Sequence, residues 1–347
     1  MKKIVGIIAA LAMAGAVFAA DFSAGVRLQG SVFGFDDAKT VTLLEEHHEN
    51  QFYHAPISFA ISDDQAGGQL KLSNVKDDDL VHADAWSIWF KPVDVLKVTV
   101  GRWSTNLNQE HMGWCNTDSG IETDGIALTI ASGAFSWDIF FASGNGNPFF
   151  TKADGADAVI KELYTKVQFG ADFGTVNAFF NGINNFKDFR FGAGLNLSGL
   201  PVGLWFNVIG TYAGDDFQRI RAEADVSTTF GSIGWELFVA GGYDMKASAP
   251  GLCNAFTGVE GWHVGGSYGR GDAAAFCGFY TKFSIPGDGM DFFVEIKDGD
   301  VLAKDFSMQL YPGFTTRVGC CSIKTGVDAQ LQKNVKINVP FELTVNF

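Results

Sequence analysis

Charged side chains at every second position of otherwise apolar segments are the residues whose spacing could do chemistry in this chain. The clearest segment is 220–226, where Arg221, Glu223 and Asp225 alternate with four apolar residues. In a β-strand, a period of two puts the two sets on opposite faces. One face of this segment must therefore meet water while the other meets an apolar medium.

Similar alternation elsewhere gives a set of polar side chains that would share one face of a sheet. If that face lines a water-filled lumen, these side chains are the candidate site residues, because charges at a constriction decide which solutes pass. Since they carry both signs, the pattern fits an open aqueous passage and also a lumen closed by charge pairing. The predicted lumen-lining residues are Arg27, Gln29, Lys97, Arg221, Glu223, Asp225, Glu236, Lys324 and Asp328.

Metal-binding and catalytic patterns are weak by comparison. His47, His48 and Glu49 offer imidazole and carboxylate ligands, but no second histidine follows four residues after the first, as a zincin requires. The remaining histidines fall mostly in predicted loops. We therefore expect no metal site, no cofactor and no enzymatic activity.

Five cysteines follow residue 19, an odd number that excludes complete pairing within the chain. Cys115 and Cys253 lie in predicted loops and could form one disulfide or remain free. Cys320 and Cys321 are adjacent at a predicted turn, with no second cysteine pair at zinc-ribbon spacing. The sequence therefore does not predict a zinc site at this pair, and it leaves the state of the two thiols open.

The composition excludes several classes of protein. Hydrophobic residues make up 47% of the chain, but no run of about 18 apolar residues follows residue 19, which rules out spanning a membrane with helices. The 42 glycines and 33 phenylalanines favour strands and tight turns, since both residue types are costly in helices. The formal net charge of −14 argues against a nucleic-acid partner.

The first 19 residues have the layout of a cleaved secretory signal. Lys2 and Lys3 precede an apolar stretch over 4–18, which is shorter than the roughly 20 residues that a spanning helix needs. Small residues at Val17 and Ala19 mark the expected cleavage site. We predict a signal peptide over 1–19 and a single folded domain over 20–347.

From residue 20 onward, alternating segments of about ten residues are separated by turn signals. About 330 residues at roughly 20 per strand and connector give about 16 strands, and aromatic residues near strand ends favour a membrane barrel over a soluble sandwich. We predict an all-β fold, a transmembrane antiparallel up-and-down β-barrel of 16 or 18 strands. Counting every candidate segment gives 19, an odd number that cannot close with both termini at one end, and the uncertain region is 269–319.

The predicted connectors alternate between short turns and long polar loops, as periplasmic turns and external loops do in such barrels. The short ones are 92–94, 132–134, 171–174, 198–201 and 230–233. The long ones are 34–51, 104–119, 143–159 and 244–259.

The last residues alternate without a break, with apolar side chains from Val335 to Phe347 at every second position. This resembles the terminal strand of bacterial outer-membrane porin-type β-barrel proteins. The resemblance implies that Phe347 is part of the signal read by the barrel assembly machinery, that the chain lies in outer-membrane lipid, and that it can form a homo-oligomer. Pro340, which donates no ladder hydrogen bond, is expected to mark a bulge.

Such a barrel would serve first as a porin that allows passive diffusion of small hydrophilic solutes or ions. The alternative is a surface-exposed barrel that acts as an adhesin or interaction protein through its loops, for which the Arg270–Asp272 tripeptide is the one sequence hint. A third hypothesis is a secreted soluble β protein. The sequence leaves the transported solute and the ion selectivity open.

Overall fold

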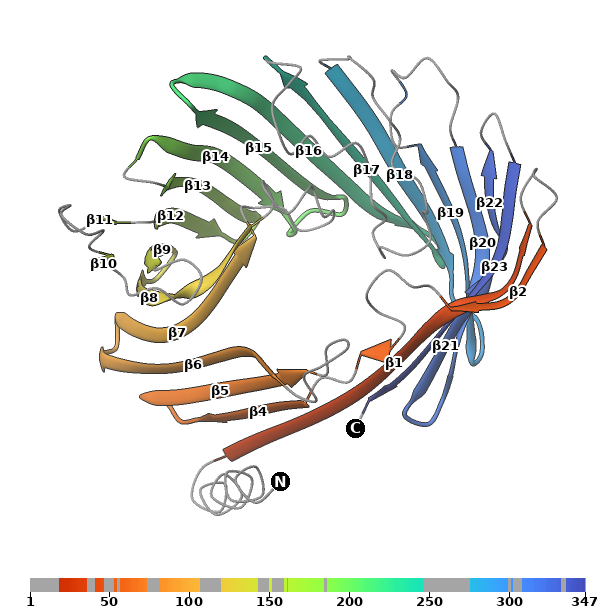
Figure 1. The fold of residues 1–347 in the computed structure, drawn as a ribbon, viewed down its shortest axis with the longest axis horizontal. Coiled ribbons are helices and arrows are strands. Elements are labelled where there is room, and N and C mark those ends of the chain that lie inside the picture. The colour runs from red at the N-terminus through yellow and green to blue at the C-terminus, as the bar shows by residue number, and fades with distance from the viewer. Residues whose placement is uncertain are drawn as a thin grey trace.

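The computed structural model describes residues 19–35, 41–46, 53–54, 57–73, 82–106, 120–142, 150–151, 159–160, 162–183, 186–245, 275–298, 301, 308–331 and 335–346. These residues form antiparallel β-strands joined by turns (Figure 1). In this part of the chain, no helix is long and apolar enough to span a membrane.

Alternating side chains and frequent turn residues divide the described chain into 23 strand segments. All but β10 and β11 belong to one sheet. The segments are β1 Ala19–Phe35, β2 Val41–Glu46, β3 Tyr53–His54, β4 Ile57–Ser62, β5 Ala66–Ser73, β6 His82–Val93, β7 Leu96–Asn106, β8 Gly120–Ser132, β9 Phe135–Ala142, β10 Phe150–Thr151, β11 Val159–Ile160, β12 Glu162–Ala171, β13 Gly174–Ile183, β14 Asp188–Leu197, β15 Gly203–Ala213, β16 Asp216–Phe230, β17 Ile233–Asp244, β18 Ala275–Ile285, β19 Met290–Asp298, β20 Met308–Val318, β21 Cys321–Gly326, β22 Asp328–Leu331 and β23 Val335–Asn346.

The first and last strands of the sheet pair with each other, which makes the sheet a closed ring. On one edge, β1 pairs with β2, β3 and β4 in turn, and on its other edge it pairs antiparallel with β23. Every remaining neighbour is also antiparallel and follows the order of the chain, as the ring of strands in Figure 1 shows. The described chain is therefore an up-and-down β-barrel.

Among the described residues, the 21 segments of the main sheet amount to 18 crossings. The segments β2, β3 and β4 form one interrupted strand along β1. Likewise β21 and β22 are one strand that keeps a single register against β23. Val327 lies between β21 and β22, directly across from Pro312. Pro312 lacks the backbone N–H that a continuous ladder would need at this point.

The even number agrees with the larger of the two predicted counts and is required by the antiparallel pairing of β1 with β23. Within the uncertain region 269–319, the stretch from Met308 to Val318, which could have been one strand or two, is the single strand β20. One prediction was wrong in part: the first long connector, 34–51, contains strand β2, which returns along β1. Val41 to Leu44 alternate weakly, so pairing with β1 and not local pattern forms this strand.

Short connections are more frequent at one end of the barrel, although the two-residue turn between β15 and β16 lies at the other end. Eight connections of two to five residues, beginning with the one after β4 and ending with the one after β20, join described strands at the former end. They include all five short connectors expected from the sequence. In the first, the backbone N–H groups of Gln65 and Ala66 each donate to Oδ1 of Asp63 at 2.7 Å, which lowers the pKa of this carboxyl below its usual value.

A bulge lies where the terminal strand closes the barrel. The register of β1 against β23 shifts between Ser31 and Phe33, opposite Pro340 and Val339. Val32, the extra residue, is exposed. The bulge expected at Pro340 is confirmed, although the extra residue belongs to the partner strand.

The burial pattern of the strands is the reverse of that in a soluble barrel. Outward-facing apolar side chains are exposed, for example Ile88 at 64% and Val176 at 50%. Inward-facing polar side chains are buried, for example Glu223 at 2% and Asp328 at 1%. A soluble barrel would bury the apolar face, so an apolar solvent is needed around this one.

Aromatic side chains mark both ends of the apolar outer face. Near the short turns, Trp137 and Trp235 each donate from Nε1 to a threonine hydroxyl on the next strand, at 2.7 Å and 2.9 Å. Toward the other end, aromatic rings on β13 to β16 contact one another from strand to strand. Phe189 and Tyr212, for example, are stacked with 4.7 Å between their centroids. This is the arrangement expected for aromatic girdles at the two interfaces of a bilayer.

Gly174, at the start of β13, cannot carry a side chain. Its φ is +149°, and a Cβ there would lie 2.0 Å from the carbonyl oxygen of Asn196. Because both backbone strain and the clash oppose it, Gly174→Ala should lower the free energy of unfolding by about 1–3 kcal/mol. Urea titration of the folded barrel measures this. Gly170→Ala is the matched control, since its Cβ would make only an ordinary 3.7 Å contact, and an equal effect of the two changes would contradict the prediction.

Candidate functional site: the polar inner face of the barrel

The predicted lumen-lining residues share the inner face wherever the structure describes their side chains. Arg221, Glu223 and Asp225 lie side by side on β16 and are buried, as are Lys324 on β21 and Asp328 on β22. On the same face, Lys97 on β7 and Glu236 on β17 are half-buried. Arg27 and Gln29 lie in β1, but the structure describes only their backbone. Phe347 lies outside the described residues.

Lys324 and Asp328 belong to a group of charged side chains on the strands from β18 to β22. The Glu295 carboxylate on β19 accepts contacts from Lys282 Nζ at 3.5 Å and from Lys324 Nζ at 3.4 Å. Lys324 also lies over the rings of Phe293 and Tyr311, 4.7 Å and 5.7 Å from their centroids. A carboxylate and two aromatic faces therefore fix this ammonium group on the wall.

Asp328, the second carboxylate of this group, is hydrogen-bonded to two glutamines. Its Oδ1 accepts from Gln309 Nε2 at 2.6 Å, and its Oδ2 accepts from Gln330 Nε2 at 3.4 Å. Lys297, on β19, lies directly across from Gln309, the residue that donates to Asp328. Lys282, Lys297 and Lys324 thus share this stretch of the wall with the Glu295 and Asp328 carboxylates, and Glu342 lies directly across from Lys324 on β23.

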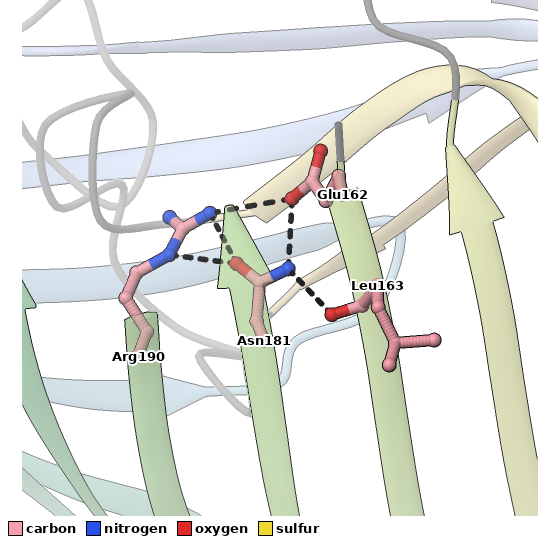
Figure 2. A network of polar contacts seen from close by, with 4 residues as sticks. All are labelled: Glu162, Leu163, Asn181 and Arg190. Atoms are coloured by element: carbon pink, nitrogen blue, oxygen red, sulfur yellow. Dashed lines mark hydrogen bonds and ion pairs between the residues drawn. The ribbon is translucent and has the colours of Figure 1, made fainter. Parts of the chain in front are cut away.

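A second network joins β12, β13 and β14 (Figure 2). Arg190 donates to Asn181 Oδ1 from Nε at 2.9 Å and from a terminal nitrogen at 2.7 Å, and that same terminal nitrogen lies 3.7 Å from the Glu162 carboxylate. Asn181 in turn donates to Glu162 at 2.8 Å and to the carbonyl of Leu163 at 3.4 Å. The Asn181 amide bridges the Arg190 cation and the Glu162 anion, so the three side chains form one network across three strands.

Between these two networks, the wall has acceptors without a hydrogen-bond donor among the described residues. Glu223 and Asn207 face each other across β15 and β16, and both are buried. Neither oxygen of Glu223, nor Oδ1 of Asn207, has a hydrogen-bond partner among the described residues. A buried acceptor without a donor costs about 1–3 kcal/mol, so water or a polar solute that donates here would be stabilised.

Several charged and polar wall residues were not among the predicted site residues. Each lies an even number of positions from an inward-facing residue of the same strand, as Glu162 does from Lys166. Because every second residue of a strand faces the same way, continuing the alternation along each strand would have identified them. Their partners come from cross-strand register, which one strand's pattern does not contain. These residues are Glu162, Asn181, Asn207, Arg219, Lys282, Lys297, Gln309 and Gln330.

Other sequence candidates lie outside the described part of the chain. These are the 47–49 histidine and glutamate cluster, Cys115, Cys253 and the Arg270–Asp272 tripeptide. Residues 265–269 have the Gly-x-Ser-x-Gly spacing of a nucleophile elbow and lie there too. Within the described residues, no group of three or more His, Cys, Asp or Glu side chains could hold a metal ion.

A closed antiparallel ring of 18 crossings, apolar outside and polar inside, defines a membrane-type up-and-down β-barrel. The sequence matches no protein-family model and no curated protein. Solved structures of similar fold include several proteins of Pseudomonas aeruginosa, among them OpdK, an outer membrane protein.

OccK3 (OpdO) has a TM-score of 0.58 at 11% identity, covering 94% of this chain and 96% of that one. OpdL has a TM-score of 0.57 at 9% identity, with 94% and 98% covered. OpdK, solved with vanillate, has a TM-score of 0.58 at 7% identity, again with 94% and 98% covered. At these identities the likeness establishes the fold, and it extends over nearly the whole of each chain.

Proposed function

We propose that this protein is a porin of the bacterial outer membrane that allows small hydrophilic solutes or ions to diffuse passively. The observation that carries the proposal is the polar inner face of a ring of 18 crossings. Barrels of 16 to 18 strands are wide enough to leave an aqueous channel, whereas about eight strands are filled by their own side chains.

The two charge networks favour an open passage over a lumen closed by charge pairing. Glu162, Asn181 and Arg190 come from three adjacent strands, and Lys282, Glu295 and Lys324 come from the four adjacent strands β18 to β21. The ion pairs between described residues thus run along the wall, which satisfies these charges without bridging the lumen. The structure of OpdK with vanillate shows a small organic anion with a barrel of similar fold, which supports the same kind of use here.

The topology also supports an orientation and an assembly route. The start of β1 and the end of β23 lie at the end of the short turns, which is the periplasmic end in barrels of this kind. In this proposal, residues 1–19 direct export, Phe347 helps the barrel assembly machinery to recognise the last strand, and the apolar outer face contacts lipid. Homo-oligomer formation remains a prediction of the porin resemblance. No described contact favours the adhesin alternative.

Charge on the inner wall should set ion selectivity. Removing two cations with Lys282→Gln and Lys324→Gln should raise the cation-to-anion permeability ratio by about twofold or more, because local charge sets ion concentration in a narrow aqueous passage. The reversal potential in a salt gradient across a planar bilayer measures this ratio. Lys187→Gln, on an exposed turn, is the control and should leave the ratio unchanged. An unchanged ratio in the double variant would contradict a lumen lined by this wall.

Solute passage itself is tested by liposome swelling. Vesicles that contain the refolded protein should swell in small neutral sugars at a rate that falls as the sugar grows larger. Swelling no faster than in protein-free vesicles, with the barrel shown to be folded and inserted, would overturn the proposed function.

A further inference from the structure

Two buried acceptors on neighbouring strands lie opposite each other on the inner face of the barrel. Asn207 on β15 is directly across from Glu223 in the middle of β16. Side chains paired in this way have Cβ atoms about 4.5–5.5 Å apart. Asn207 is 1% exposed and Glu223 is 2% exposed, yet both carboxylate oxygens and the amide oxygen have no hydrogen-bond partner among the described residues. Three acceptor oxygens are therefore gathered at one enclosed place without a donor.

The residues beside this pair do not supply the missing donor. In the same row across the sheet, Gly194 on β14 pairs with Asn207, and Ala240 on β17 pairs with Glu223. Neither glycine nor alanine has a side chain that can donate a hydrogen bond. Arg221, the inward-facing cation two residues before Glu223, donates to a backbone carbonyl of its own strand at 3.2 Å. The three oxygens are thus open to a donor that comes from outside the wall.

A buried apolar cluster borders the pair. Ala240, directly across from Glu223, belongs to this cluster together with the rings of Trp205, Phe238 and Tyr280. Trp205 is also two residues before the amide of the pair, on the same face of β15. Aromatic faces attract ammonium groups, and the apolar surface of the rings suits an alkyl chain. A solute that combines an ammonium group with a short alkyl chain would therefore find both of its parts matched here.

We propose that Asn207 and Glu223 bind the primary ammonium group of a small organic amine in the lumen. Such a group has three N–H donors and one positive charge, which match the three acceptor oxygens and the one carboxylate. Hydrogen bonds between charged partners are stronger than neutral ones, and an enclosed place strengthens them further. The proposal rests on the proposed function, since the amine reaches the inner face through the aqueous passage, and it names small alkylammonium solutes as a substrate class for that passage.

The test measures binding of n-butylammonium to the full barrel, folded in detergent, by isothermal titration calorimetry. One saturable site per barrel is expected. Tetramethylammonium carries the same charge but has no N–H donor, so it should bind about tenfold more weakly or worse, because it leaves the three oxygens unsatisfied. Equal affinity for the two cations would overturn the proposal.

Two substitutions of similar shape remove parts of the site. Glu223→Gln removes the charge and should weaken butylammonium binding by about tenfold or more, and Asn207→Leu removes one acceptor and should weaken it by about 3–10-fold. Asp215→Asn is the matched control, since it removes a carboxylate charge from the exposed turn that joins β15 to β16, and it should leave the affinity unchanged. An unchanged affinity in folded Glu223→Gln, or an equal loss in Asp215→Asn, would contradict the proposed site.

A third variant keeps the test decisive if the first two do not fold. Asn207→Asp keeps an acceptor at this position and adds a negative charge, so it should bind butylammonium more tightly, and weaker binding would overturn the proposal. Binding in detergent does not require an open passage, so current recordings in a planar bilayer separate the two proposals. Current steps without butylammonium binding would overturn this site and leave the porin function standing, whereas binding without current would support the site and overturn the porin function.

Discussion

Ala224→Arg is expected to destabilise the folded barrel by about 2–4 kcal/mol in a lipid bilayer. Ala224 lies near the middle of β16, on the face opposite Glu223 and Asp225. If that face contacts hydrocarbon, an arginine there must be taken out of water, and the cost is highest near the bilayer midplane. Reversible urea unfolding in vesicles, followed by tryptophan fluorescence, measures the change.

A surface substitution of the same kind supplies the comparison. Ser232 lies in the exposed turn between β16 and β17, where Ser232→Arg should cost about 0–1 kcal/mol. If Ala224→Arg cost no more than Ser232→Arg, the apolar outer face would not be in lipid. The soluble β protein would then be the better account of the chain.

Arg190→Ala should be the most destabilising change on the inner wall, at about 3–5 kcal/mol. The substitution leaves the Glu162 carboxylate, whose side chain is 16% exposed, without its cation, and leaves Asn181 Oδ1 without its donor. Removing one partner of a buried pair leaves an uncompensated charge, which costs more than the pair itself contributes. The midpoint of urea unfolding reports the loss.

Two further variants separate this effect from a general loss of side-chain volume. Lys187→Ala removes a cation from an exposed turn nearby and should change stability by less than about 0.5 kcal/mol. Adding Glu162→Gln to Arg190→Ala should recover about 0.5–3 kcal/mol, because the two side chains are coupled. Additive losses in the double variant would show that the pair in Figure 2 does not stabilise the wall.

Much of this architecture follows from local pattern. The alternation around Arg221, Glu223 and Asp225 predicts which face each side chain occupies, and burial agrees. The short connectors follow from turn residues, and the bulge follows from Pro340, because a missing backbone donor disturbs the ladder wherever it falls. These features depend only on residues close together in the chain.

What pattern alone does not provide is pairing across strands. Val41 to Glu46 form a strand because β1 offers an edge to them, and their own alternation is weak. Glu162 meets Arg190 only because β12, β13 and β14 take a particular register. The same holds for Glu295 and Lys324, which are separated by a whole strand. Ion pairs on the wall are therefore properties of the closed sheet.

The most direct test of the central claim, an aqueous lumen through a membrane-spanning barrel, is conductance of the purified protein in a planar lipid bilayer. Insertion should produce discrete current steps of uniform size, and the current should scale with the conductivity of the salt solution, as flow through a water-filled passage does. A barrel that is folded, inserted and resistant to denaturation, yet silent at every voltage applied, would contradict the account.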